Sequence, residues 1–326
     1  MRRRDLLGVV TGAAIAVATG MPDSGCAAED KTFRVGIASL VNSRSAPQFL
    51  AFEERLRQLA TAAGRDLAIE FRLLDGDADR FPAAMQELVR GHPDLILAPG
   101  QEIAAKAARA ATQTIPIVVV AIDYDPVALG YVQNLARPGG NITGVYLDTI
   151  EVAAKRAQLL KEAAPDIKRL IVFWDAVGAD SFKATVPAAQ TLGLTVQSVE
   201  LRNPPYDYEA ALVTATPAPG DALLCMASPY FFHDVQQLDE LAVRHRLPSM
   251  CGGVDSGGLI AYSASLNAMF RTAADYAGKI LKGAKPGDLP IQQPTRFKLV
   301  VNLKVAQALG LTVPQSILGR ADEVIE

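Results

Sequence analysis

Arg137-Pro138-Gly139-Gly140-Asn141 interrupts, near the middle of the chain, a regular alternation of strand-like and helix-like segments. Short runs rich in Val, Ile and Leu alternate with longer helical runs before this stretch, and the alternation starts again after it. A proline followed by two glycines is typical of a turn, because neither residue type continues a regular element well. The stretch therefore predicts an α/β chain with two doubly wound units, divided near Gly144.

Both units follow the same pattern of short apolar strands and longer helices. Such strands are typical of parallel sheets that helices cover on both faces. In the first unit we expect strands at 33–39, 67–73, 94–98 and 115–121, with helices at 46–63, 79–91 and 103–112. In the second unit we expect strands at 170–173, 194–201, 222–226 and 247–250, with helices at 150–164, 182–192, 208–215 and 235–246. A helix at 267–282 and a strand at 297–301 follow, and they could cross back between the units.

Residues 1–28 have the features of a signal peptide. Three arginines at 2–4 precede a mostly apolar run at 6–18, which is too short to span a bilayer. Cys26-Ala27-Ala28 offers small residues for cleavage before Glu29. The sequence therefore predicts that the protein leaves the cytoplasm and is periplasmic.

Three routes of export and attachment stay open. Arg3-Arg4-Asp5-Leu6-Leu7 resembles a twin-arginine signal, and an ordinary Sec signal is the alternative. Ser24-Gly25-Cys26 fits the last positions of a lipoprotein processing site, which would anchor the chain through a lipid on Cys26. Asp23 departs from that pattern, so the lipid anchor is the less favoured prediction.

The charge balance argues against a nucleic-acid partner. The chain has 32 Lys and Arg against 35 Asp and Glu, and the predicted signal removes three of the former and two of the latter, which leaves a net charge of −4. Binding to nucleic acid depends on a positive surface that neutralises phosphates. We expect a protein that binds no nucleic acid and is a monomer.

No motif for catalysis or a cofactor stands out. Asp75-Gly76-Asp77-Ala78-Asp79 lacks the glycine and glutamate of a calcium loop and is better explained as a turn that caps the next helix through Asp79. Asp255-Ser256-Gly257-Gly258 resembles a protease nucleophile segment, but a loop that needs backbone freedom at two glycines explains it better. There is no phosphate-binding loop and no Cys/His cluster with metal-ligand spacing. We therefore expect a protein that is not an enzyme and holds no cofactor or metal.

The chain has two cysteines outside the signal, Cys225 and Cys251, at the ends of two predicted strands. They could be neighbours in a parallel sheet and joined by a disulfide in an oxidising compartment. Two buried free thiols are the favoured alternative.

Polar and aromatic side chains gather where the predicted strands end. In open α/β sheets, ligands bind beyond the carboxyl ends of the strands, where helix N-termini also direct backbone N–H groups. Gly100 and Gln101 open a helix there and are a natural seat for a carboxylate. The candidate ligand-binding residues are Ser39, Asn42, Gly100, Gln101, Asp123 and Asp125 in the first unit, and Trp174, Ser228, Tyr230, Asp255 and Tyr262 in the second. Together they predict a cleft that encloses a small solute.

Several long segments resemble one protein family. The stretch 135–144, which includes Arg137-Pro138-Gly139-Gly140-Asn141, is similar to the hallmark segment of ABC transporter substrate-binding proteins of the tryptophan/tyrosine type. The segments 280–286, 294–297, 299–304, 308–311 and 320–325 match that family as well, as does 76–80. The resemblance covers nearly the whole chain behind the signal.

The resemblance implies a type I periplasmic-binding-protein fold, in which two Rossmann-like lobes joined by three crossovers close on a ligand. The first lobe would comprise 29–145 and about 265–290, and the second 146–264 and about 291–326. The implied function is to bind an amino acid or another small carboxylated compound and to deliver it to an ABC permease in the membrane. Gln101 and Trp174 depart from the family pattern, which leaves the identity of the solute open.

Two other functions stay open at this stage. A ligand-sensing module for a membrane receptor would use the same cleft. An exported α/β enzyme would instead turn over a bound compound and would depend on His233, Ser256 or Asp255.

Overall fold

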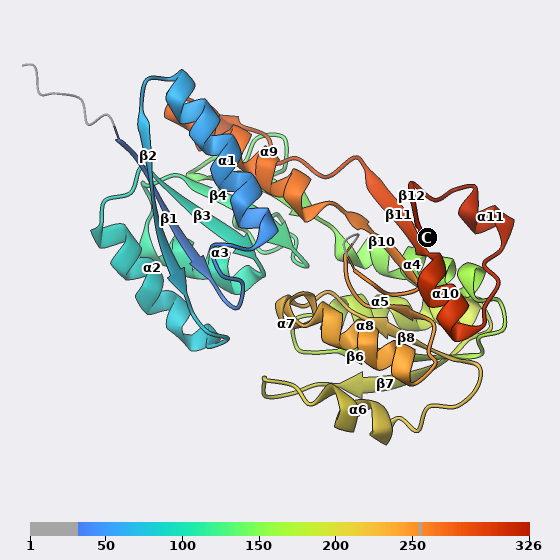
Figure 1. Cartoon of the computed structure of the whole chain (residues 1–326). Coiled ribbons are helices and arrows are strands. Elements are labelled where there is room, and N and C mark those ends of the chain that lie inside the picture. Colours follow the sequence, from blue (N-terminus) through green and yellow to red (C-terminus); the bar gives the residue numbers. More distant parts are fainter. Residues whose placement is uncertain (1–31, 254–255) are drawn as a thin grey trace, which may run out of the picture. The chain divides into compact units, whose positions relative to one another are not determined.

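The computed structural model describes residues 32–253 and 256–326 (Figure 1). The predicted signal at 1–28, with its alternatives for export and lipid attachment, lies outside the described residues. Among the described helices, none is long and apolar enough to cross a membrane.

The first lobe is a five-stranded parallel sheet with helices on both faces (Figure 1). Its strand order is β2-β1-β3-β4-β5, and every pair in it is parallel. Helices α1 and α9 pack together on one face, and α2 and α3 on the other. The strands are β1 (Thr32–Ser39), β2 (Asp66–Leu73), β3 (Leu95–Gly100), β4 (Ile117–Ile122) and β5 (Ile142–Leu147); the helices are α1 (Pro47–Ala62), α2 (Phe81–Arg90), α3 (Glu102–Ala111) and α9 (Leu266–Leu281).

The second lobe repeats this plan with four parallel strands in the order β7-β6-β8-β9. Helices α4 and α5 cover one face, α6 and α8 cover the other, and the short α7 follows β8. The strands are β6 (Arg169–Trp174), β7 (Thr195–Glu200), β8 (Asp221–Cys225) and β9 (Ser249–Met250); the helices are α4 (Thr149–Ala163), α5 (Ala179–Thr191), α6 (Tyr208–Thr214), α7 (Pro229–His233) and α8 (Val235–Arg244).

A third, three-stranded sheet links the two lobes. Strand β10 (Ile260–Ala264) pairs antiparallel with β11 (Phe297–Asn302), and β11 pairs parallel with β12 (Glu323–Ile325). The chain passes between the lobes from β5 to α4, from β10 to α9, and again before β11. The helices α10 (Leu303–Leu309) and α11 (Gln315–Leu318) complete the tail on the second lobe.

Strand β5 fits into the first lobe because Gly144 has no side chain. Gly144 has a φ of +144°, and a Cβ atom there would overlap the backbone of Val119 on β4. The returning segment also packs backbone against backbone, since a Cβ at Gly287 would lie 2.6 Å from the amide nitrogen of Gly140. The amide of Gly139 donates to the carbonyl of Gly287, and that of Gln292 to Gly144. The central stretch is therefore a docking surface for the chain that returns from α9.

The parallel, doubly wound architecture expected from the sequence is confirmed, and the differences are local. Gly144, near which we expected the division, lies inside β5, which the sequence did not predict as a strand. The helix expected at 79–91 begins with a separate 3₁₀ turn, Ala78–Arg80, whose cap is Asp77 rather than Asp79. Strands β10 and β12 and the helices α7, α10 and α11 were also not expected.

The two cysteines form a disulfide, which corrects the expectation of free thiols. Cys225 is the last residue of β8 and Cys251 follows β9, the neighbouring parallel strand. Adjacent parallel strands bring their ends to one edge of the sheet, so two cysteines at those ends lie within bonding reach. The disulfide therefore ties together the carboxyl ends of β8 and β9.

Replacing Gly144 by Ala should destabilise the protein more than replacing Gly140 by Ala. The two glycines have nearly the same φ, +144° and +146°, but only a Cβ at Gly144 meets the backbone of another strand. We expect G144A to lower the free energy of unfolding in urea by about 1–3 kcal/mol more than G140A does. Equal losses would show that the backbone conformation alone, and not the approach of β5 to β4, requires glycine.

Candidate functional site

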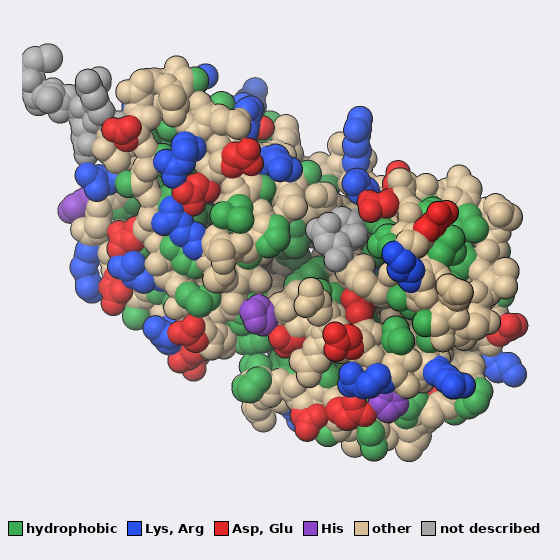
Figure 2. Space-filling view, in the orientation of Figure 1, with side chains coloured by type: hydrophobic (Ala, Val, Ile, Leu, Met, Phe, Trp, Pro, Cys, Tyr) green, Lys and Arg blue, Asp and Glu red, His purple; other side chains and the backbone are tan. Residues whose placement is uncertain are grey.

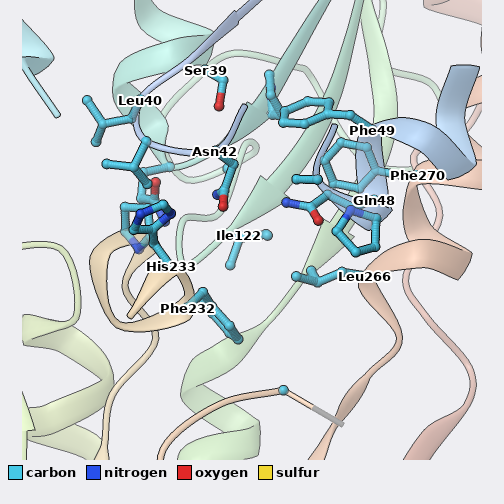
Figure 3. A pocket seen from close by; sticks show the side chains of 18 of the residues that line it. Ser39, Leu40, Asn42, Gln48, Phe49, Ile122, Phe232, His233, Leu266 and Phe270 are labelled. Carbon is cyan, nitrogen blue, oxygen red and sulfur yellow. The ribbon is translucent and has the colours of Figure 1, made fainter. Parts of the chain in front are cut away.

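A cavity of about 330 Å³ lies at the carboxyl ends of the strands, between residues of both lobes. The first lobe contributes residues that follow β1 and β3, the end of β4, and the first turns of α1 and α9. The second lobe contributes α7 and the loop after β9. Figure 3 shows these side chains converging on one open space.

The wall of the cavity is largely apolar and aromatic. Phe49 of α1 and Phe270 of α9 meet edge to face, with ring centroids 5.2 Å apart. Phe81 and Phe232 add two further rings, and Figure 3 shows Phe232 on the opposite side from Phe49 and Phe270. Aromatic rings on both sides suit an apolar, flat or branched body of solute.

Four of the residues predicted from the sequence line this cavity: Ser39, Asn42, Gly100 and Gln101. They lie together because β1 and β3 are neighbours and end at the same edge of the sheet. The side chains of Asn42 and Gln101 are half-buried and bond to no other residue that the structure describes. Both carboxamides are therefore free to donate to, and accept from, a ligand.

The start of α3 is a poorer seat for a carboxylate than the sequence suggested. Gly100 and Gln101 precede the helix, but its first residue, Glu102, brings its own negative charge to the same end. The hydroxyl of Tyr131 donates to the Glu102 carboxylate. A second anion at this helix end would be repelled by Glu102.

Tyr230 connects the two lobes. It lies in α7, and its hydroxyl donates to the carbonyl oxygen of Gly76, which follows β2 in the first lobe, at 2.9 Å. Ser228 lies two residues earlier, and its buried hydroxyl donates to Asp175 at 2.5 Å and accepts from the amide of Tyr230. The structure therefore gives Ser228 the role of a helix cap and does not place it in the wall of the cavity.

Asp123 follows β4 and is held by two hydroxyls of the second lobe. Its Oδ1 accepts from Ser181 at 2.8 Å and from Thr149, the first residue of α4. Its Oδ2 is buried and has no hydrogen-bond partner among the described residues. Burial raises the pKa of the Asp123 carboxyl above its usual value, and the two hydroxyl donors oppose that rise. The side chain thus connects the two lobes near the point where the chain first passes between them, from β5 to α4, and it does not line the large cavity.

The remaining predicted residues lie elsewhere. Asp125 is exposed and caps a turn by accepting from the amide of Val127 at 2.7 Å. Trp174 stacks on Phe182 and donates to Ser198, away from the cavity. Asp255 lies outside the described residues.

Tyr262 lines a second, smaller chamber of about 30 Å³, which shares Ile122, Phe232 and Leu266 with the large cavity. Tyr262 belongs to β10, and its ring stacks on that of Phe297 in the neighbouring strand. Thr149 and Ser181, the two donors to Asp123, also line this inner chamber. A smaller space, whose wall includes several hydroxyls, therefore adjoins the large cavity.

The loop after β9 forms part of the cavity wall and is fixed by Asp239 of α8. Gly253 and Ser256 line the cavity, and the amide of Gly257 donates to the Asp239 carboxylate at 2.6 Å. Burial raises the pKa of Asp239 to about 6. Neither Gly257 nor Gly258 needs a positive φ, contrary to the expectation from sequence. A Cβ at Gly258 would instead lie 3.0 Å from the Ser249 hydroxyl, so close packing accounts for glycine there.

Sequence reasoning missed several lining residues, among them Gln48, Phe49, Phe232, Leu266, Asn267 and Phe270. Most lie in the first turns of helices that follow strands. Their amphipathic pattern indicated which residues face a core, but not that the apolar face extends past the end of the sheet. The described residues contain no cluster of three or more His, Cys, Asp or Glu that could hold a metal ion.

A family model described as "ABC transporter substrate binding protein" matches residues 34–325. A tyrosine-binding protein of Clostridioides difficile is 24% identical over 294 residues, which covers 86% of this chain and 82% of the relative. Among solved structures, an ABC domain from Streptococcus pneumoniae in complex with L-Trp has a TM-score of 0.76 at 26% identity, and covers 90% of this chain and 100% of its own. A conserved domain protein from Vibrio cholerae has a TM-score of 0.75 at 24% identity over 90% of this chain and 99% of its own. These similarities confirm the two-lobed periplasmic-binding-protein fold.

Replacing Asp123 by Asn should flatten the pH dependence of stability. The pKa of the Asp123 carboxyl is raised in the folded protein. Its contribution to the free energy of unfolding is therefore complete at a pH below the ordinary pKa of 3.8, and it is lost as the pH rises through the pKa of the folded protein. The carboxamide in D123N would keep an oxygen for Ser181 and Thr149 without carrying charge. We expect wild type to lose stability relative to D123N as the pH rises above about 4, measured by urea unfolding at a series of pH values.

The exposed Asp125, changed to Asn, is the matched control and should leave that pH dependence unchanged. A D123N protein with the same pH profile as wild type would contradict the buried placement of Asp123.

Proposed function

Because the chain belongs to the ABC transporter substrate-binding protein family, we propose that it captures a small solute outside the cytoplasm and delivers it to an ABC permease. The observation that carries the proposal is the cavity of about 330 Å³, whose wall comes from both lobes. A solute there touches both lobes at once only when they are close together. Binding therefore shifts the population toward the closed state, whose shape the permease can recognise.

The solute that best fits is an amino acid or another small carboxylated compound with an apolar body. Four phenylalanines supply apolar contact, and Ser39, Asn42, Gly100 and Gln101 supply polar contact. The similar proteins that bind tyrosine and tryptophan support an aromatic body for the solute. Gln101, which departs from the family pattern, would give this chain its own preference among the solutes of that class.

The protein has the properties of a carrier rather than of an enzyme. Its family is one of substrate-binding proteins, and the cavity wall holds apolar rings and carboxamides beside His233 and Ser256. The face in Figure 2 carries acidic and basic side chains interspersed, which favours a protein that binds no nucleic acid. The signal at 1–28 would place it in the periplasm by the twin-arginine or the Sec route, with a lipid on Cys26 as the less favoured form.

Native mass spectrometry of protein purified from a periplasmic extract should detect one small molecule bound per chain. Substrate-binding proteins close around their solute and release it slowly, so the solute should survive gentle purification. Isothermal titration with L-tyrosine and L-tryptophan, after unfolding and refolding to remove the retained molecule, tests the aromatic class directly. A protein that carries no small molecule and binds neither amino acid, or one that converts a bound compound, would contradict the proposal.

Changing Tyr230 to Phe should weaken solute binding by destabilising the closed state, because Tyr230 is not in the cavity wall. The variant loses the hydrogen bond to Gly76 across the lobes but keeps the aromatic ring. One neutral hydrogen bond contributes about 0.5–1.5 kcal/mol, so the dissociation constant should rise about two- to tenfold.

The control is Tyr206→Phe, which removes a neighbouring hydroxyl that bonds to Asp175 within the second lobe. Y206F should leave affinity within about twofold of wild type. Equal effects of the two variants, or none from Y230F, would show that the Tyr230 contact does not contribute to closure.

A further inference from the structure

Arg156 of α4 is a buried cation at the carboxyl edge of the second lobe's sheet. The residue is 9% exposed, and its guanidinium donates to the carbonyl oxygens of Cys225 at 3.0 Å and Met250 at 3.1 Å. Those two residues end β8 and β9, the strands that the disulfide joins. The Nε–H group faces the sulfur of Met250. The guanidinium thus lies at the carboxyl ends of the strands, which is where ligands bind in open α/β sheets.

No carboxylate of the described residues balances this charge. Within that part of the chain Arg156 forms no ion pair within 4.0 Å, unlike Arg169 of the same lobe, which pairs with Asp221. Burial lowers the pKa of Arg156 to about 10, and no acidic neighbour among those residues raises it again. Its contacts are neutral carbonyl and thioether groups, which solvate a guanidinium without neutralising it. A buried cation that the described residues leave without a counter-charge is costly, and an anionic ligand would offset that cost.

Arg156 also lines the inner chamber of about 30 Å³ that adjoins the large cavity. A water molecule needs about 10–15 Å³ of such a cavity, so the chamber has room for about two water-sized groups, such as the two oxygens of a carboxylate. The hydroxyls of Thr149 and Ser181 lie in the same wall, and each already donates its one proton to Asp123. Asp123 accepts from both hydroxyls, and its raised pKa means that it holds a proton more readily than an ordinary carboxyl does.

We propose that the inner chamber is the anion subsite of the cleft: the carboxylate of the solute enters it and pairs with Arg156, while the apolar body stays among the phenylalanines of the large cavity. The two spaces share Ile122, Phe232 and Leu266, so one solute can occupy both. This inference rests on the proposed function and deepens it, because it names the group that the second lobe recognises. It also moves the carboxylate away from the start of α3, where Glu102 would repel it.

The experiment compares acids with their isosteric amides. Isothermal titration of wild type, R156Q and R169Q would use two pairs of probes, 3-phenylpropionate with 3-phenylpropionamide and L-tyrosine with L-tyrosinamide. The carboxamide in R156Q can still donate to the strand-end carbonyls but carries no charge. Arg169 is the matched control, because it also ties strands of this sheet together, through Asp221, at their opposite ends.

Wild type should bind each acid at least about tenfold more tightly than its amide, because a hydrogen bond to a charged group contributes about 1.5–3 kcal/mol. In R156Q that preference should disappear through weaker binding of the acid, with the amide within about threefold of wild type. R169Q should keep the preference even where its melting temperature falls.

Three results would overturn the inference: equal affinity of wild type for acid and amide, an undiminished preference in R156Q, or equal weakening of both probes in R156Q, which would make Arg156 a structural residue only. The comparison in wild type needs no variant, so it stands even where R156Q does not fold. Binding of acid and amide alike would leave the proposed solute-binding function intact. Failure of wild type to bind any acid overturns the inference whatever molecule the protein retains.

Discussion

The contact of backbone with backbone around Gly139, Gly140 and Gly144 is the constraint on which the two-lobed architecture depends. Strand β5 joins the first sheet only because Gly144 leaves room for Val119. From the end of β5 the chain crosses into the second lobe, and the segment that returns from α9 docks on the same stretch through Gly287 and Gln292. Two of the three segments that pass between the lobes, from β5 to α4 and before β11, are thus held at the same stretch, 139–144. A hinge anchored in this way lets two lobes move without separating.

The direction of the strands determines where a solute can bind. All strand pairs within the two lobes are parallel, so each sheet has one carboxyl edge, and the helix starts and loops at both edges form the cavity wall. Tyr230 and Asp123 then hold the edges together, the first through Gly76 and the second through Ser181 and Thr149. The solute site and the contacts between the lobes therefore lie next to each other, which couples binding to closure.

Periodicity in the sequence predicted most of the fold, because buried parallel strands and the helices that cover them carry strong apolar patterns. It failed for β5, whose Ile142, Thr143 and Gly144 follow a turn and contain the glycine that the packing requires. The site was predicted in part. Ser39, Asn42, Gly100 and Gln101 line the cavity because a position at the end of a strand, or just after it, is enough to bring them there. The position of a residue in the sequence could not show that Ser228 and Asp125 form local caps instead. It also could not show that Trp174 stacks on Phe182, since these roles depend on neighbours in space.

The crystal structure of the protein with its retained solute is the measurement that tests the account most directly. The account predicts one molecule that contacts both lobes, with its apolar body beside Phe49, Phe232 and Phe270 and its anionic group within hydrogen-bonding distance of Arg156. A solute held by one lobe alone, or a solute whose charged group lies at the start of α3 with the inner chamber occupied only by water, would contradict it.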